Sequence, residues 1–286
     1  MKQTYRQIHA TPKPFVKWAG GKRQLISILN ENLPKTFGTY YEPFLGGGAL
    51  LFHILTEKNG PKCSISDLNS DLVLAYTTIR DRVDELISSL KSHEKNYQKD
   101  SKSYYYSVRD TNPRSEIEKT SRLLFLNRTC FNGLYRVNLK GKFNVPLGKY
   151  TNPNIVNEEN LHSVSDILQS SRVSIKCRDF EAVLRDAKKG DLVYFDPPYQ
   201  PVSETANFTS YTNKNFTFDD LSRLVELCMK LDSKGCKVLL SNSDSKQVSD
   251  MFAKRPWKVS KIQANRSINS NSKKRTGHFE LLIKNY

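Results

Sequence analysis

The sequence predicts an open α/β sheet of about seven strands, and three features of the chain favour this fold class. Two glycine-rich segments, 17–22 and 42–50, each lead into a segment with helical apolar spacing. An acidic residue, Asp67, ends a short β-rich run roughly 20 residues after the second glycine segment. The apolar run 192–195 ends in Asp196-Pro197-Pro198-Tyr199. Glycine and acidic residues at strand ends are typical of the nucleotide-binding crevice of such sheets.

The first part of the chain alternates predicted helices and strands. Its elements are, in order, a helix over 25–29 that ends near Pro34, a strand over 39–44, a glycine turn and helix over 45–52, and a strand over 63–66. Asp67 follows the last of these strands, where an acidic side chain can accept both hydroxyls of a ribose. The alternative is that Asp67 caps the next helix.

The segment 70–157 differs in character from the parts on either side of it. It is rich in Lys, Arg, Tyr and Asn, begins with helical patterning and ends in hairpin-like stretches punctuated by Gly and Pro. We therefore predict one α/β domain, formed by 1–69 and 158–286, with 70–157 inserted into it. In the last part we expect strands at 173–176, 192–195, 237–240 and 279–283, helices at 180–188 and 218–230, and a disordered loop at 267–275.

The composition is that of a globular protein with an excess of positive charge. The 286 residues are 37% hydrophobic and carry a formal net charge of +16, which favours a nucleic acid partner over a membrane unless the basic surface is merely solvated. No apolar run approaches the roughly 20 residues that cross a bilayer, and no signal sequence follows Met1, so we expect a cytoplasmic protein. The five cysteines are scattered, so neither disulfides nor a structural zinc site is expected.

The tetrapeptide Asp196-Pro197-Pro198-Tyr199 combines groups that suit an amino group on a planar ring. Proline removes backbone donors, so the Pro197 carbonyl and the Asp196 carboxylate present two acceptors side by side, which can hold an NH2 group. Tyr199 adds a flat face for stacking. A flipped adenine or cytosine fits this arrangement, and the alternative is a simple strand-terminating turn.

Six motifs occur along the chain in an order that is found in a known family. They are F-x-K-W-A-G-G-K (15–22), E-P-F-x-G-G-G-A (42–49), S-D-x-N (66–69), N-R-x-x-F-N-G-L-x-R (127–136), F-N-V-P-x-G-x-Y (143–150) and D-P-P-Y (196–199). On these motifs the chain resembles the Dam-type, α-class DNA N6-adenine methyltransferases over essentially its whole length. The resemblance implies a Rossmann-like S-adenosylmethionine-dependent methyltransferase sheet. It also implies that the insert is a mainly helical target-recognition domain ending in a β-hairpin, and that the substrate is adenine in GATC sites of double-stranded DNA.

The resemblance further implies which residues bind S-adenosylmethionine. It also implies a reaction that needs no metal. The binding residues are Lys22 for the carboxylate, Asp67 for the ribose hydroxyls, Asp179 and Phe180 for the adenine, Trp18 and Phe44 as walls, Gly46 and Gly48 at the methionine part, and Asp196. The two glycines let the backbone approach closely, because any side chain would fill that space. A phosphate loop at 20–22 is excluded because the G-x-x-x-x-G-K-[ST] spacing is absent.

For catalysis, the resemblance implies that the target adenine leaves the base stack and that its N6 attacks the sulfonium methyl in line. The catalytic motif is Asp196, Pro197, Pro198 and Tyr199. Hydrogen bonds from N6 to the Asp196 carboxylate and the Pro197 carbonyl favour a tetrahedral nitrogen, and Tyr199 stacks on the ring. Most of the remaining acceleration comes from positioning, and flipping costs a few kcal/mol that the enzyme must offset.

The residues implied for DNA recognition lie in the last part of the insert and, in one case, before it. They are Arg136 for guanine, Leu134 and Pro146 for a thymine methyl, Lys17 and Tyr150 to complete the set, Phe131 as the intercalating ring, and Asn132 and Arg128 beside it. Without the resemblance, Phe131 would be assigned to the core, and Leu134 and Pro146 to packing and turns. Arg128, Lys140, Lys142 and Lys149 are phosphate contacts or solvated charges. Residues 201–211 resemble a mobile loop of the family and are expected to order on DNA.

Two other functions stay open on the sequence alone. Methylation of cytosine N4 or of RNA adenine is disfavoured, because Asp196 stands where the cytosine enzymes often carry serine. A non-catalytic, basic DNA-binding protein is disfavoured because Asp196, Lys22 and Asp67 are all intact. We expect a monomer in solution, and roles in restriction–modification, repair and regulation are all compatible with the motifs.

Overall fold

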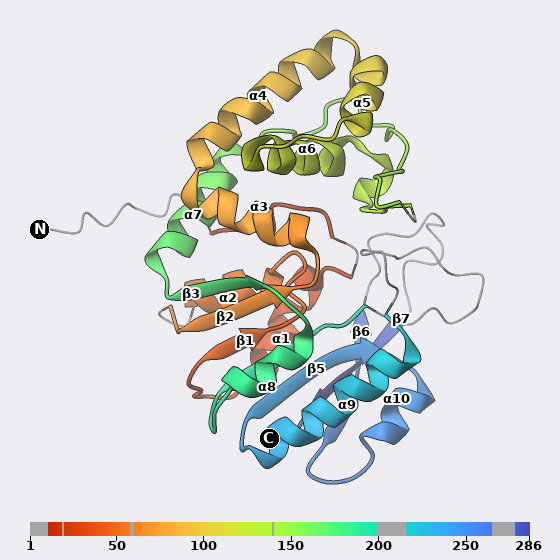
Figure 1. The fold of residues 1–286 in the computed structure, drawn as a ribbon. Helices are drawn as coiled ribbons and strands as arrows, with labels where there is room; N and C mark the ends of the chain where they lie inside the picture. Colours follow the sequence, from red (N-terminus) through yellow and green to blue (C-terminus); the bar gives the residue numbers. More distant parts are fainter. Residues whose placement is uncertain (1–10, 19, 58–59, 139, 199–215, 265–277) are drawn as a thin grey trace, which may run out of the picture.

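The protein is described by a computed structural model that covers residues 11–18, 20–57, 60–138, 140–198, 216–264 and 278–286. Within these residues a sheet of seven strands has the order β3-β2-β1-β4-β5-β7-β6, which confirms the predicted open α/β sheet (Figure 1). The strands are β1 (Tyr40–Glu42), β2 (Cys63–Asp67), β3 (Val173–Cys177), β4 (Leu192–Phe195), β5 (Lys237–Ser243), β6 (Lys258–Ala264) and β7 (His278–Lys284).

Strand β1 lies at the centre of the sheet and is parallel to both of its neighbours, β2 and β4. The sheet continues in parallel from β2 to β3 on one side and from β4 to β5 on the other. Strand β7 then pairs antiparallel with both β5 and β6. The strand order therefore reverses between β1 and β4, and the loops that follow these two strands lie at the same edge. In open α/β sheets this switch point is where ligands bind.

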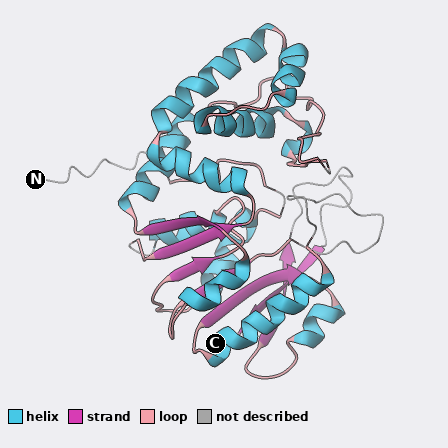
Figure 2. Cartoon of the chain, viewed as in Figure 1, coloured by secondary structure: helices cyan, strands magenta, loops and turns pink. Residues whose placement is uncertain are grey.

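Side chains of the central strands alternate between two hydrophobic cores, one on each face of the sheet. Tyr40 and Tyr194 belong to the core that α1 and α2 cover, whereas Tyr41 and Phe195 belong to the core under α9 and α10. Figure 2 shows helices on both sides of the strands. The elements that cover the sheet are the 3-10 helix η1 (Lys22–Leu25), α1 (Ile26–Asn32), α2 (Ala49–Glu57), the 3-10 helix η3 (Phe180–Ala182), α8 (Val183–Asp186), α9 (Phe218–Ser233) and α10 (Lys246–Met251).

The chain between β2 and β3 forms a helical layer at one end of the sheet. Its elements are α3 (Ser70–Asp81), α4 (Val83–Lys99), α5 (Ser101–Asp110), α6 (Glu116–Thr129), the 3-10 helix η2 (Phe131–Gly133) and α7 (Glu158–Ser170). Helix α3 contacts β2 and β3 on one side and α6 and α7 on the other, so it lies between the sheet and α4–α6 (Figure 1). One continuous core therefore runs from the sheet into these helices. Between α6 and α7, two isolated antiparallel bridges, Cys130–Leu147 and Val137–Phe143, form the hairpin-like part.

Several helices begin at the residues that the sequence favours for capping. Ser115 and Glu118 form a reciprocal capping box at the start of α6, and Thr217 and Asp220 form another at the start of α9. The Asn69 side chain accepts from the Leu72 N–H and caps α3. Each cap of this kind stabilises a helix by about 1 kcal/mol. The Asn69 cap fixes where α3 leaves β2, at the carboxyl edge of the sheet.

The structure adds one strand that the sequence analysis did not name. Strand β6 is an edge strand with mostly exposed, polar side chains such as Lys258 and Lys261, so it lacks the apolar run used to recognise the other strands. The helix expected over 180–188 is shorter, because it consists of η3 and α8. The loop expected at 267–275 lies outside the described residues. In the described part of the chain, no helix is both long and apolar enough to span a membrane.

Candidate active site

Asp67 and the glycine turn after β1 meet at the carboxyl edge of the sheet. The Asp67 carboxylate accepts from the Gly46 N–H at 3.0 Å and from the Asn69 N–H at 2.9 Å. Burial raises the pKa of Asp67, and these backbone donors oppose the shift by favouring its ionised form. The acidic side chain is therefore held in place at the end of β2, beside the turn that joins β1 to α2.

The glycine turn has the backbone conformation and the close packing that exclude larger residues. Gly46 and Gly48 have φ values of +49° and +66°. A Cβ atom on Gly46 would lie 3.0 Å from Trp18 Cδ1, and one on Gly48 would lie 2.5 Å from the Tyr76 hydroxyl oxygen. That hydroxyl donates to the Gly46 carbonyl at 3.2 Å. The turn is thus held between Trp18 on one side and Tyr76 of α3 on the other.

The Lys22 ammonium lies between two carboxylates at the switch point. Lys22 Nζ is 2.8 Å from Asp196 Oδ1, which follows β4, and 3.6 Å from Glu280 Oε2 of β7. It also donates to the Gly20 carbonyl at 3.0 Å. The Lys22 side chain is 4% exposed, and those of Asp196 and Glu280 are 19% and 10% exposed. An ion pair this well shielded from water is strong and depends closely on its geometry.

Burial also sets the protonation of the carboxyl groups around Asp196. It raises the pKa of Asp196 to about 6, while Lys22 opposes the shift and Glu280 adds to it. Burial raises the pKa of Glu42, at the end of β1, to about 8, and a hydrogen bond from the Tyr40 hydroxyl at 2.9 Å opposes that shift. Asp196 is thus ionised at neutral pH but more basic than an ordinary aspartate, whereas Glu42 is largely protonated.

The residues expected around the cofactor adenine lie close to one another. Phe44 stacks on Phe180, with ring centroids 5.1 Å apart and planes at 27°. The Arg223 guanidinium lies 4.9 Å from the Phe180 ring centroid and bonds to Asp179 Oδ1 at 3.0 Å. Arg223 also pairs with Glu181 and Asp220. Phe44, Asp179 and Phe180 are therefore in one cluster, which Arg223 of α9 ties together.

Of the remaining residues in the catalytic motif, Pro197 is buried and Pro198 is exposed. Both follow β4, which is buried at every position. Tyr199 and the loop at 201–211 lie outside the described residues, so their predicted roles stay predictions.

Asn127 joins the N-terminal segment around Lys17 to the predicted recognition segment. It is buried and exchanges hydrogen bonds with both backbone groups of Lys17, at 2.7 and 2.8 Å, and donates to the Gly133 carbonyl at 3.0 Å. Lys17 Nζ in turn donates to the Tyr150 hydroxyl at 3.2 Å and lies 4.4 Å from the centroid of that ring. The structure thus brings Lys17 and Tyr150 together, as their expected common role requires.

Phe131 and its neighbours form a sharp, exposed turn after α6. Phe131 is 42% exposed, and the next residue, Asn132, has a φ of +55°, which is uncommon for a residue with a side chain. The Phe131 N–H donates to the carbonyl of Pro146, which is also exposed. Leu134 is half-buried and packs against the core. Without the resemblance, Phe131 would be assigned to the core. The structure shows instead that its side chain is exposed.

Arg136 is placed by an asparagine across the hairpin-like part. Its Nε donates to the Asn144 side-chain oxygen at 2.8 Å, and the Asn144 N–H donates back to the Arg136 carbonyl at 3.1 Å. This arrangement fixes the direction of a guanidinium that is still partly exposed. A second guanidinium nitrogen, Nη2, also donates to the Asn144 carbonyl at 3.4 Å.

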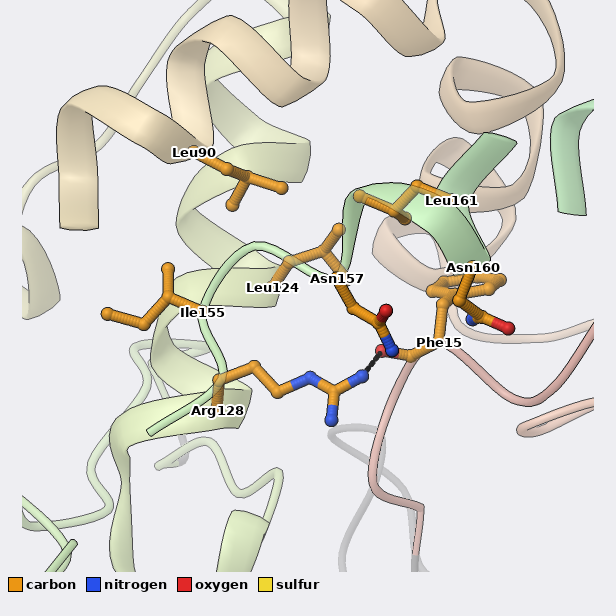
Figure 3. Close-up of a pocket in the computed structure, with 8 residues that line it drawn as sticks. All are labelled: Phe15, Leu90, Leu124, Arg128, Ile155, Asn157, Asn160 and Leu161. Atoms are coloured by element: carbon orange, nitrogen blue, oxygen red, sulfur yellow. Dashed lines mark hydrogen bonds between the residues drawn. The ribbon is translucent and has the colours of Figure 1, made fainter. Parts of the chain in front are cut away.

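Arg128 differs from its expected place. Its guanidinium lines a small cavity between α4, α6 and α7 and donates to the Phe15 carbonyl at 2.7 Å (Figure 3). Burial lowers the pKa of Arg128. The predicted contact with a DNA phosphate does not fit this position, because the charge faces apolar and amide groups inside the helical layer. The residue instead ties the segment before Lys17 to α6.

Sequence reasoning missed several residues that hold the site. They are Glu280 and Arg223 at the crevice, Tyr76 behind the glycine turn, and Asn127 at the junction with the recognition segment. Glu280 had a usable signal, because it is a charged residue within the apolar strand of 279–283, and such charges are almost always paired. Asn127 opens a motif that had been recognised. Tyr76 and Arg223 lie in ordinary helical patterns and had no signal.

Comparisons with known proteins identify the family to which the chain belongs. A family model described as D12 class N6 adenine-specific DNA methyltransferase matches residues 18–268. The type II methyltransferase M.MjaIII of Methanocaldococcus jannaschii is 45% identical and spans 96% of this chain and 99% of its own length. The type II methyltransferase M1.LlaDCHI of Lactococcus lactis subsp. cremoris is 40% identical, over 96% and 95%. The DNA adenine methylase of Escherichia coli strain K12 is 32% identical, over 94% of each chain.

These matches cover the sheet and the helical insert together, and they favour adenine in DNA over cytosine N4 or RNA adenine. They equally favour an enzyme over a non-catalytic DNA-binding protein. The chain therefore belongs to the D12 class of N6 adenine-specific DNA methyltransferases, and it is an adenine-specific DNA methyltransferase.

Proposed function

We propose that this enzyme transfers a methyl group from S-adenosylmethionine to N6 of a flipped adenine in GATC sites of double-stranded DNA. The observation that carries the proposal is the placement of Asp196. Its carboxylate lies at the carboxyl end of β4, shielded from water, held by Lys22 and directly followed by Pro197. This is the switch point of the sheet, beside the glycine turn and Asp67.

The proposed cofactor site runs along the edge of the sheet from Lys22 to Phe180. Asp67 would hold the ribose hydroxyls, and the backbone of the Gly46–Gly48 turn, whose conformation requires glycine, would approach the methionine part. Phe44 and Phe180, with Asp179, would hold the adenine, and Trp18 would close the wall beside the turn. The donor set fits a nucleoside with a charged, flexible tail. Lys22 would pair with the carboxylate of that tail.

The proposed chemistry takes place at the two acceptors after β4. The bound cofactor supplies an electrophilic methyl on its sulfonium, so that the N–C bond forms as the C–S bond breaks with its electron pair on sulfur. Asp196 and the Pro197 carbonyl accept hydrogen bonds from N6 and favour the tetrahedral nitrogen that can attack. The surplus N6 proton moves to Asp196, which is a better base than an ordinary aspartate because burial raises its pKa to about 6.

The proposed DNA surface is formed by the turn after α6 and by the hairpin-like part. Arg136, held by Asn144, would read a guanine, and the Lys17–Tyr150 pair would contact the adjoining bases. Phe131 would enter the stack in place of the flipped adenine. The remaining members of this set are Asn132, Leu134 and Pro146. We also propose that the enzyme acts as a monomer, in the cytoplasm where the DNA is.

A methylation assay tests the proposal. The purified protein is incubated with labelled S-adenosylmethionine and a set of duplexes, one containing GATC and the others carrying single changes within it. Label on adenine of the GATC duplex alone is the expected result. Label on several duplexes would refute the specificity, and label on no DNA would refute the proposed reaction.

A further inference from the structure

The Lys22 ammonium has two carboxylates within reach, and the two are not equivalent. Asp196 Oδ1 is 2.8 Å from Lys22 Nζ, which is a hydrogen-bonded ion pair. Glu280 Oε2 is 3.6 Å from the same nitrogen, beyond hydrogen-bond length. Lys22 comes from η1 and Glu280 from β7, so the two are brought together only by the folded sheet.

Glu280 Oε2 is an unsatisfied hydrogen-bond acceptor. Among the residues that the structure describes, this atom is buried and accepts no hydrogen bond. A buried carboxylate oxygen without a hydrogen bond is costly, and a nearby cation offsets part of that cost. Lys22 is that cation. Its ammonium therefore lies close to Glu280 Oε2 without donating a hydrogen bond to it.

The Lys22 ammonium weakens Asp196 for the proposed chemistry as long as it stays bonded there. An ammonium bonded to Asp196 Oδ1 occupies that oxygen and lowers its strength as an acceptor. The proposed reaction needs the same carboxylate for the N6 hydrogen bond and for the surplus proton. A second carboxylate 3.6 Å from Nζ lets the ammonium shift without losing its counter-charge in a buried site.

We propose that Glu280 is a positioning residue that takes the Lys22 ammonium over from Asp196 when the amino group of the target adenine bonds to Asp196. The inference rests on the proposed function, because it assigns to Glu280 a part in the same reaction. Glu280 touches neither substrate nor cofactor in this scheme. It acts through Lys22 and leaves Asp196 as the full acceptor.

The charged and titratable groups around Asp196 give the inference a characteristic pH signature. Lys22 faces it from η1, Glu280 from β7, Glu42 from β1 and Tyr194 from β4. Replacing Glu280 with glutamine removes a negative charge that raises the pKa of Asp196. The acid limb of the rate profile, which follows ionisation of Asp196, therefore moves to lower pH, while the rate at its plateau falls because Lys22 stays on Asp196.

Two variants and a matched control test this role. Glu280→Gln removes the charge at constant size, and Glu280→Asp keeps the charge. Glu226→Gln is the control, because it removes an exposed carboxylate on α9 that pairs with Lys230. Each is measured for S-adenosylmethionine binding, GATC duplex binding, melting temperature and single-turnover methylation between about pH 5 and 9.

In Glu280→Gln we expect a plateau rate at least about tenfold below wild type, with both affinities within about twofold and an acid limb at lower pH. Glu280→Asp should keep the acid limb of the wild type, and Glu226→Gln should match it throughout. A Glu280→Gln enzyme with the wild-type rate and profile would overturn the inference. So would equal losses in both Glu280 variants with an unshifted acid limb, since these indicate packing. A wild-type enzyme that methylates no duplex would instead overturn the proposed function itself.

Discussion

Removal of the Lys22 charge tests how the site sets the protonation of Asp196. With Lys22 in place, the pKa of Asp196 is about 6, although burial and Glu280 both raise it. An opposite charge at 2.8 Å lowers the pKa of a carboxyl by roughly 1 to 3 units. In Lys22→Gln we therefore expect the pKa of Asp196 to rise to about 7 to 9.

The size of this shift decides the rate at neutral pH. With a pKa of about 8, only about a tenth of Asp196 is ionised at pH 7, so the methylation rate should be roughly tenfold below that of the wild type. The loss should disappear as the pH rises towards about 9, because the carboxylate ionises again. A binding defect alone would not recover in this way.

The assay is single-turnover methylation of a GATC duplex across this pH range. S-adenosylmethionine is kept at a saturating concentration in each reaction, because Lys22 is also the proposed partner of the cofactor carboxylate. Lys230→Gln is the control, since it removes an exposed lysine that pairs with Glu226 on the surface of α9. An acid limb that stays near the wild-type position in Lys22→Gln would refute the link between Lys22 and the ionisation of Asp196.

Four further substitutions test other parts of the structure. Asp196→Ala should abolish methyl transfer while a gel-shift assay still detects DNA binding, and substantial turnover would contradict its role as the N6 acceptor. Arg136→Ala should cost about 1 to 3 kcal/mol of discrimination at one guanine, whereas equal weakening on all sequences would indicate a phosphate contact. Gly48→Ala should lower the free energy of unfolding by about 1 to 3 kcal/mol, because its φ is +66° and the new Cβ meets Tyr76; adding Tyr76→Phe should restore part of it in urea titrations. The folded-state pKa of Glu42 is about 8, above its ordinary 4.5, so its stabilising protonation is complete below the lower value and lost as pH rises through the higher one. Glu42→Gln should therefore gain stability relative to wild type at alkaline pH, and a pH-independent difference would argue against a buried, protonated Glu42.

The parts of the site that the sequence predicted are those encoded by neighbouring residues. Asp196 and Asp67 each follow a recognisable strand, and the turn at Gly46–Gly48 is marked by glycines, so their common location follows from the fold class. Glu280 depends on β7 entering the sheet beside β5, which no local pattern specifies. Arg128 shows the opposite error, because a basic residue in a DNA-binding motif turned out to face the inside of the protein.

The hydrogen bonds of Asn127 constrain how such enzymes can be recombined. The predicted boundaries assign Lys17 to the α/β domain but Asn127, Gly133 and Tyr150 to the insert, whereas the structure joins all four through one amide and one ammonium. A chimaera that exchanges residues 70–157 alone would therefore divide a bonded unit between two parents. Transplanting a new recognition specificity should succeed more often when the strip around Lys17 travels with the insert.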